Sequence, residues 1–168
     1  DVKAALTGDF AAAYTGNVTL NDANGVDITA TDITQIEGDT NGTITVSNNI
    51  DINGTAAEVA AAVADVDTFS GTPTATLSNA HTLAQLKTIN DALSGTLTLN
   101  DYSVALEGST ADVKAALNGN FAAAYTGNVT LSDADSANVA GADITTIEAA
   151  TNGTITVSNN INITGTAA

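Results

Sequence analysis

Two acidic segments hold the side chains best suited to bind a metal ion. The first runs Asn21-Asp22-Ala23-Asn24-Gly25-Val26-Asp27, and the second runs Ser132-Asp133-Ala134-Asp135-Ser136-Ala137-Asn138. Carboxylate and amide oxygens are the ligands that calcium prefers in proteins. Asp22, Asp27, Asp133 and Asp135 are therefore the calcium candidates, although neither segment has EF-hand spacing and the second lacks the glycine. The alternative is that these are solvated corner residues, since Asn and Asp favour turns.

Catalytic chemistry finds little support in the sequence. His81 is the only histidine and the chain has no cysteine, so His81 has no second imidazole or thiolate as a co-ligand. A catalytic base needs oriented partners, and Ser47, Ser70 and Ser94 lie at corners with no base nearby in any motif. We expect a helix-start or surface role for His81, and we predict that the chain is not an enzyme.

Paired threonines and Asn-x-Thr sequons are the other polar signals. The Thr-x-Thr pairs are Thr43/Thr45, Thr74/Thr76, Thr96/Thr98 and Thr154/Thr156. Stacked on one outward wall, they would form a ladder of the kind that binds ice or glycan; the alternative is simple strand propensity. The sequons begin at Asn17, Asn41, Asn53, Asn128, Asn152 and Asn162, where glycans would lie on surface corners in a host that attaches them.

An internal repeat dominates the sequence. Residues 1–57 return at 112–168 without a gap, with 41 identities at 57 aligned positions. A fixed period of this kind is typical of architectures in which each unit buries its apolar face against a neighbour. A residue that recurs with the period is therefore interpreted first as a structural part of the repeat.

The period of 111 residues divides into smaller units, here called rungs. A glycine introduces a short alternating run at Gly16, Gly42, Gly71, Gly95, Gly127 and Gly153, so four rungs fill one period. Ile44 and Val46 would share one face of such a run, as would Leu97 and Leu99, which is the pattern of a half-buried strand.

Helix patterns close the rungs. The apolar stripes are Val59/Val63/Val66, Leu83/Leu86/Ile89/Leu93, Val113/Leu117/Phe121 and its counterpart Val2/Leu6/Phe10, with a shorter helix at Ile33/Ile36 and Ile144/Ile147. Thr55-x-x-Glu58 and Thr82-x-x-Gln85 predict capping boxes. We expect Ile44, Val46, Leu97, Leu99, Val113, Leu117 and their repeats to form the core.

Strand and helix alternate about every 25 residues, which indicates crossover connections and parallel strands. The sequence predicts an α/β-solenoid with short parallel ladders, a helix in most rungs and about four rungs per repeat. Residues 1–168 would form one segment, with a full repeat at 1–111 and the start of the next at 112–168. A doubly wound sheet is the alternative.

The amino-acid composition excludes several kinds of binding partner. The formal net charge is −16, with 19 acidic residues against three lysines. This balance argues against nucleic acid, which requires clustered basic residues, and against an anionic bilayer. No apolar run approaches the ~20 residues of a membrane helix, so we expect no membrane insertion. We interpret the chain as a segment of a longer repetitive protein.

Several phrases carry a resemblance to a known family. They are Ile163-Thr164-Gly165-Thr166-Ala167-Ala168, Asn53-Gly54-Thr55-Ala56-Ala57-Glu58-Val59 and Leu93-Ser94-Gly95-Thr96-Leu97-Thr98. The chain resembles the tandem repeats of giant, acidic, Thr/Ala/Asn-rich surface proteins of marine cyanobacteria and other marine bacteria. That resemblance implies an extracellular or cell-surface protein with a role in surface structure, adhesion or motility. The glycine-rich nonapeptide calcium repeat of many relatives is absent here.

These observations lead to one expected function and one alternative. We expect a non-enzymatic structural rod or spacer module of a giant secreted or cell-surface protein or filament. Its partners would be neighbouring repeats of the same protein, with end-to-end self-association of copies. The alternative is an adhesin-type binding module that uses the acidic corners with calcium, or the threonine ladders with ice or glycan.

Overall fold

The computed structural model describes residues 2–8, 12 and 14–166 and shows an α/β protein with parallel sheets. The six helices of these residues are α1 (Val2–Leu6), α2 (Ala30–Asp39), α3 (Ala56–Asp65), α4 (Leu83–Ala92), α5 (Thr110–Leu117) and α6 (Gly141–Ala150). The strands before α4 are β1 (Val18–Leu20), β2 (Asp27–Thr29), β3 (Ile44–Val46), β4 (Asp51–Gly54), β5 (Thr68–Phe69) and β6 (Thr74–Leu77). Those after α4 are β7 (Thr96–Thr98), β8 (Leu106–Gly108), β9 (Asn120–Phe121), β10 (Val129–Leu131), β11 (Asn138–Ala140), β12 (Ile155–Val157) and β13 (Asn162–Thr164).

Every strand pair is parallel, as the sequence predicts. The sheets have the orders β1-β3-β5, β2-β4-β6-β7-β9, β8-β10-β12 and β11-β13, and none closes into a barrel. Paired residues are separated by between 22 positions, as for Ala75 with Leu97, and 26 positions, as for Val18 with Ile44. Neighbouring strands are thus joined by connections that include a helix, which parallel pairing requires.

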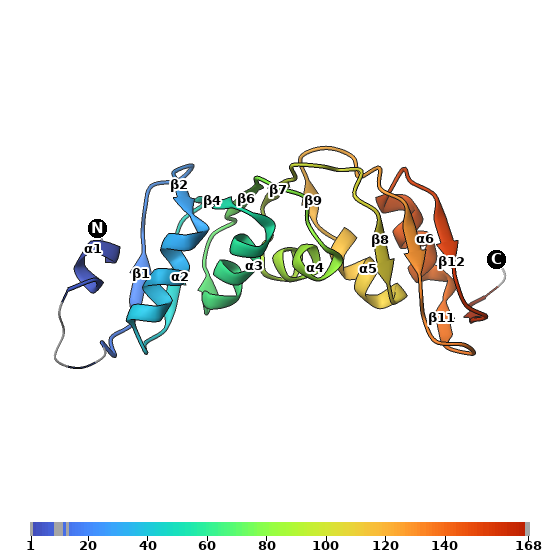
Figure 1. Ribbon diagram of the computed structural model, residues 1–168, viewed down its shortest axis with the longest axis horizontal. Helices are drawn as coiled ribbons and strands as arrows, with labels where there is room; N and C mark the ends of the chain where they lie inside the picture. The colour runs from blue at the N-terminus through green and yellow to red at the C-terminus, as the bar shows by residue number, and fades with distance from the viewer. Residues whose placement is uncertain (1, 9–11, 13, 167–168) are drawn as a thin grey trace.

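The helices follow one another in space as they do in sequence. Figure 1 shows α2, α3, α4 and α5 side by side along the long axis, with the N-terminal end at one extreme and the C-terminal end at the other. Each helix contacts the next, from α1 with α2 through to α5 with α6. The molecule is therefore elongated, and segments far apart in the sequence lie far apart along its axis.

The sheets change their relation to the helices along the chain. In the first three rungs, strands that precede a helix form one sheet (β2, β4, β6) and strands that follow a helix form another (β1, β3, β5). From α4 onward, the strands β7 and β9, which follow helices, join the sheet of β6. The alternating run after Gly71 is Thr74–Leu77, and the sequence predicts that it opens its rung as Ile44–Val46 does. That prediction is wrong. That place belongs to β5, whose two residues are too short to show an alternating pattern.

Side-chain caps mark the starts of α3 and α4. Both predicted capping boxes are present: Thr55 with Glu58, and Thr82 with Gln85, exchange side-chain and backbone hydrogen bonds at the starts of α3 and α4. These bonds satisfy amides that have no partner within the helix. The helices around Ile33 and Ile144 are not shorter than the others, since α2, α3, α4 and α6 each have 10 residues.

The predicted stripe that runs from Val113 to Phe121 is wrong at its end. The helix α5 stops at Leu117, and Phe121 lies in β9. Asn118-Gly119 follows the helix, and Asn and Gly are typical of helix C-termini and of the turns beyond them. The counterpart Phe10 lies outside the described residues.

A single apolar core runs through the rungs. All six residues named as core are buried, namely Ile44, Val46, Leu97, Leu99, Val113 and Leu117. Their counterparts in the other copy are not all buried. Val157, the counterpart of Val46, is 39% exposed, whereas Val46 is fully buried. The reason is position, because no described strand pairs with the outer edge of β12.

The corner glycines mark close approaches of backbone between rungs. A Cβ atom at Gly42 would collide with the backbone carbonyl of Gly16, and one at Gly153 with that of Gly127. Thr40 adds a link at the same corner, since its hydroxyl donates to the carbonyl of Gly16 at 2.9 Å. Glycine at these corners therefore lets successive rungs come into contact.

Candidate functional site

The second acidic segment is part of the contact between rungs. Asp133 accepts hydrogen bonds from the backbone amide of Thr110, at 3.0 Å, and from its hydroxyl, so the carboxylate holds the first residue of α5. A carboxylate at a helix N-terminus is also favoured by the helix dipole. Asp133 thus serves to place α5 on the following rung.

Asp135 has an equally structural position. Its Oδ1 accepts from the backbone amide of Asn160 at 3.0 Å, and its counterpart in the first copy, Asn24, accepts from Asn49 at 2.9 Å. The residues that follow, Gly25 and Ser136, have φ angles of 75° and 65°, so both adopt the left-handed conformation. The exchange of Asn for Asp and of Gly for Ser therefore leaves the corner geometry intact.

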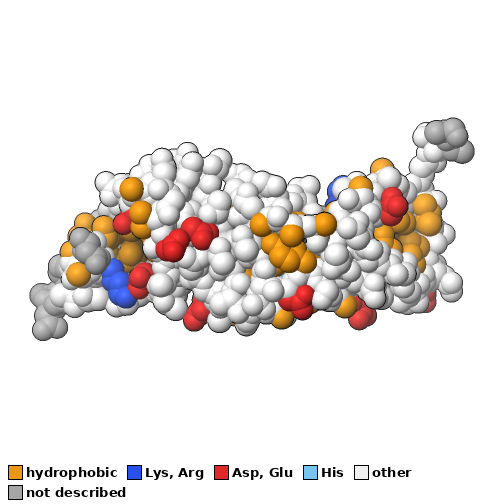
Figure 2. Space-filling model, turned by 90° about the horizontal axis from the view of Figure 1, so that it is seen from above, with side chains coloured by type: hydrophobic (Ala, Val, Ile, Leu, Met, Phe, Trp, Pro, Cys, Tyr) orange, Lys and Arg blue, Asp and Glu red, His pale blue; other side chains and the backbone are white. Residues whose placement is uncertain are grey.

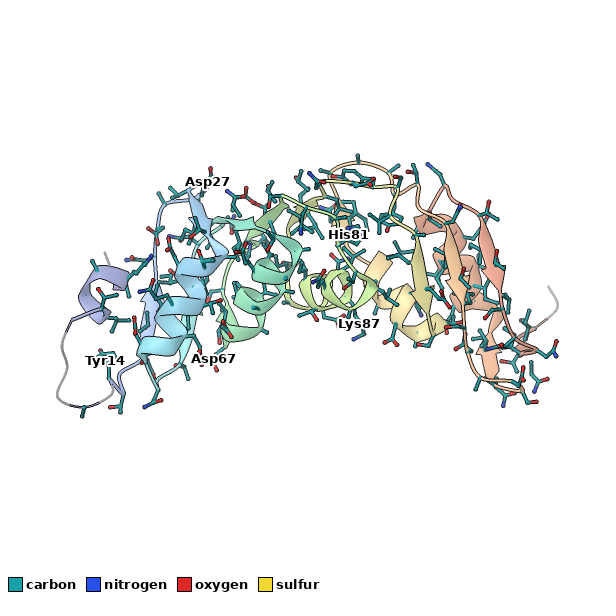
Figure 3. The ribbon with its side chains drawn as sticks, in the orientation of Figure 1. Tyr14, Asp27, Asp67, His81 and Lys87 are labelled. Carbon is teal, nitrogen blue, oxygen red and sulfur yellow. The ribbon has the colours of Figure 1, made fainter. Side chains whose placement is uncertain are left out.

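Asp22 and Asp27 lie at the N-terminal end of the molecule. Both border a hollow that is also lined by Lys3 and Asp32, which form an ion pair. Figure 3 shows Asp27 at one edge of the molecule, on β2, where it lies directly opposite Asp51 of β4. The hydroxyl groups of Thr74 and Thr76 donate to the two carboxylate oxygens of Asp51, at 2.9 and 3.0 Å.

The two pairs of calcium candidates lie in different parts of the molecule. Asp22 and Asp27 belong to one end of the molecule, and Asp133 and Asp135 belong to the rungs beyond α5. Within residues 2–8, 12 and 14–166, no group of three or more His, Asp or Glu side chains could hold a metal ion. The carboxylates that are engaged serve as acceptors for the amides and hydroxyls of the next rung.

His81 lies at the start of α4 in a buried polar cluster, so the expected helix-start position is confirmed and the expected surface role is wrong. It precedes the N-cap Thr82 and is only 4% exposed. Its Nε2 lies 3.0 Å from the hydroxyl of Tyr125, and that hydroxyl donates to the carbonyl of Val104 at 2.6 Å. Because the tyrosine proton is used on Val104, Nε2 carries the proton that it donates to Tyr125. This cluster joins Tyr125 to residues 44 and 21 positions earlier in the chain. Figure 3 labels the position of His81.

The cluster favours a neutral histidine. Burial lowers the pKa of His81 below its ordinary value of 6.5, and the Asp101 carboxylate opposes this only in part. Burial also raises the pKa of the Tyr125 hydroxyl, and Asp101 raises it further. The His81 Nδ1 atom is buried and has no hydrogen-bond partner among the described residues. A proton there would add a buried charge without an acceptor, so the geometry suits structural support rather than proton transfer.

The threonine pairs do not form one ladder. Thr45 pairs with Thr19 and Thr68 in the first sheet, whereas Thr76 pairs with Asn53 and Thr98 in the second. Thr156 lies in a third sheet, opposite Thr130. The expectation of a single outward wall is therefore wrong, because the Thr-x-Thr pattern occurs both in strands that follow helices and in strands that precede them.

Another hollow lies between α5 and α6. Lys114, Leu117, Phe121, Ile147 and Ala150 are among the residues that line it. Figure 2 shows apolar side chains at both ends of the molecule and in a central patch, with carboxylates scattered between them. No helix in the described part of the chain has the length and apolar character needed to cross a membrane.

Comparisons with family models, with curated proteins and with solved structures give no match to this chain.

Two features escaped the sequence reasoning. One is the His81–Tyr125 cluster, which joins residues 44 positions apart. The sequence offers a weak signal for it, since Tyr125 recurs with the repeat and His81 is unique within the chain. The other is the apolar C-terminal end of the molecule, where Ile163 is 65% exposed although its counterpart Ile52 is fully buried. A comparison of the two copies by burial is needed to find it.

Proposed function

We propose that this chain is a segment of an α/β-solenoid that acts as a non-enzymatic structural rod or spacer in a secreted or cell-surface protein or filament. The observation that carries the proposal is the order of the parts in space. Helices contact the next helix in sequence, and strands pair with strands one rung away. Stacking of this kind gives a molecule whose length grows with the number of repeats.

Polar bonds between rungs support a rigid rod. The side-chain oxygen of Asn17 accepts from the amide of Thr43 at 3.1 Å, and that of Asn128 accepts from Thr154 at 2.9 Å. Asn49 accepts from Thr72 at 2.7 Å in the same manner. Each rung thus satisfies backbone groups of the next, and an ordered corner resists bending better than a solvated one.

A surface location fits the charge and the resemblance described above. A formal net charge of −16 keeps like molecules apart and opposes binding to polyanions. The calcium-dependent adhesin has less support, because Asp133 and Asp135 already accept amide and hydroxyl hydrogens. A melting temperature that is the same with calcium and with chelator removes that alternative.

Immunogold electron microscopy of the source cells, with antibodies raised against this chain, tests the proposal. The expected result is label along cell-surface filaments or on a continuous surface layer, with repeated label on each filament because the epitope recurs. Label confined to the cell interior would overturn the proposed role.

A further inference from the structure

The C-terminal end face consists of β12, β13 and the segment between them, residues 155–165, together with α6. Nine of its residues match residues 44–54, and only Asn162 and Thr164 differ, standing where the first copy has Asp51 and Asn53. In the first copy these residues are covered by the next rung. In the second copy Val157 and Ile163 are 39% and 65% exposed, against full burial of Val46 and Ile52.

We propose that the C-terminal end face is a docking surface for a rung with the sequence of residues 58–80. This inference rests on the proposed successive-rung architecture. The occupant is specified by the internal precedent, in which α3, β5 and β6 cover the face formed by α2, β3 and β4.

The covering segment brings backbone hydrogen bonds to two strand edges. The amides of Asp67 and Ser70 donate to the carbonyls of Ile44 and Val46 at 3.0 and 2.9 Å. Those of Thr74 and Ser78 donate to Ile50 and Gly54 at 2.9 and 2.8 Å. β12 and β13 are the last strands of their sheets, so the same carbonyl row lies at an open edge. An open edge of parallel strands is a template for strand addition.

The covering segment also brings one polar anchor and an apolar stripe. The carboxylate of Asp67 accepts from the amide of Ile44 at 2.7 Å, and Ile155 presents the equivalent amide at the C-terminal end face. The buried residues of α3 are Ala56, Val59, Ala62 and Val63, small side chains that let two helices approach closely. Ile33 of α2 is fully buried there, whereas its counterpart Ile144 of α6 is only partly buried.

The N-terminal end of a second copy does not fit the same face. Its strand β1 is the counterpart of β10, and β10 pairs on that side with β8, a strand that directly precedes a helix. The C-terminal end face instead offers β12, which follows the helix α6, so the open edge of β1 would meet a strand of the other kind. The net charge of −16 further opposes contact between copies. The face therefore selects one rung of the repeat rather than any free end.

The test extends the full chain after Ala168 with residues 58–80, which preserves the spacing of the first copy. The matched control carries the same extension with the added copies of Val59→Asp and Val63→Asp. Amide hydrogen exchange over residues 155–164 is the readout, and residues 44–53 of the same molecule serve as the covered reference.

The expected result is that the extension slows exchange at 155–164 by at least about tenfold toward the rate at 44–53, while the control extension does not. Equal exchange in the extended, control and unextended chains would overturn the proposal. Concentration-dependent association of the unextended chain, with protection at 155–164, would also overturn it, because a second copy would then be the occupant. None of these outcomes depends on where the protein acts, so they are separate from the immunogold test.

Discussion

The two copies of the repeat differ most where a neighbouring rung is present for one and absent for the other. Tyr14 is 38% exposed and its counterpart Tyr125 is 1% exposed, because Tyr125 contacts His81 and Val104, which lie 44 and 21 positions earlier in the chain. At the C-terminal end the first copy is the buried one, since Ile52 is fully buried and its counterpart Ile163 is 65% exposed. The same residue type in the same local structure is therefore core or surface according to its neighbour.

This difference shows where stability comes from in the molecule. A rung has too few residues to bury its own apolar side chains, so each depends on the rung before it and the rung after it. Energies of substitution should then follow position along the axis rather than residue identity, and paired substitutions in the two copies measure that dependence.

The largest contrast is expected at the C-terminal end. Ile52→Ala should lower the free energy of unfolding by about 2–5 kcal/mol, because it opens a cavity in the covered core. Ile163→Ala should change it by no more than about 0.5 kcal/mol, because that side chain is mostly in water. Urea denaturation followed by circular dichroism measures both. Similar losses at the two positions would contradict the dependence on neighbours.

The contrast at the N-terminal end should be smaller and opposite in order. Tyr125→Phe keeps the ring but removes the hydroxyl, which leaves the Val104 carbonyl and the His81 Nε2 proton without partners. A cost of about 1–3 kcal/mol is expected, and Tyr14→Phe should cost less because Tyr14 is 38% exposed whereas Tyr125 is buried. Thermal unfolding of the two variants at pH 7.5 gives the comparison. A greater loss for Tyr14→Phe would break the account at this end.

The two copies also differ in the residue type at a corner whose backbone is left-handed. Ser136 adopts a left-handed φ of 65° where the first copy has Gly25 at 75°. Ser136→Gly should therefore raise the free energy of unfolding by roughly 1 kcal/mol, and Gly25→Ser should lower it by a similar amount. A Cβ at Gly25 would meet no atom within 4 Å, so the loss there measures backbone conformation alone. Chemical denaturation is sufficient, and an unchanged midpoint for both variants would refute the assignment of strain.

The smallest expected effect is the dependence of stability on pH through His81. The pKa of His81 is lowered in the folded state, so the unfolded chain binds a proton at a higher pH than the native chain. Stability should be complete above about pH 6.5 and should fall as the pH decreases from there toward the lowered native value. Unfolding midpoints between pH 8 and pH 5 measure the slope. His81→Gln should flatten it; a slope that persists in this variant would assign the effect to other groups.

The acidic side chains affect stability in a separate, lower pH range. The hydrogen bond from Lys3 lowers the pKa of Asp32, and bonds from the Thr55 amide and hydroxyl lower that of Glu58. Both groups therefore contribute stability above their ordinary values of 3.8 and 4.5 that is lost at lower pH. The histidine slope can thus be read before the carboxylates begin to titrate.

The local elements could be predicted well from the sequence. The capping boxes at Thr55 and Thr82, the alternation at Ile44 and Val46, and the parallel pairing all follow from short-range patterns. The errors have long-range causes. Thr74–Leu77 has the pattern of an opening strand, but it pairs with β4, and only the three-dimensional path decides which sheet receives a strand.

In the candidate site, too, the errors come from long-range contacts. Calcium ligands and solvated corner residues were both open interpretations of the acidic segments, and neither includes the use of Asp133 to hold Thr110, a contact 23 residues away. The burial of His81 depends on Tyr125, which is 44 residues away. No local pattern reports such contacts, because they form only when segments far apart in the sequence pack together.

Small-angle X-ray scattering of a chain with residues 1–111 duplicated in tandem is the most direct test of the successive-rung account. If rungs stack along one axis, adding 111 residues to 168 should raise the radius of gyration by about 1.7-fold and leave the cross-sectional radius unchanged. A rise of only about 1.2-fold, as expected for a globular protein of that size, with a thicker cross-section, would contradict it.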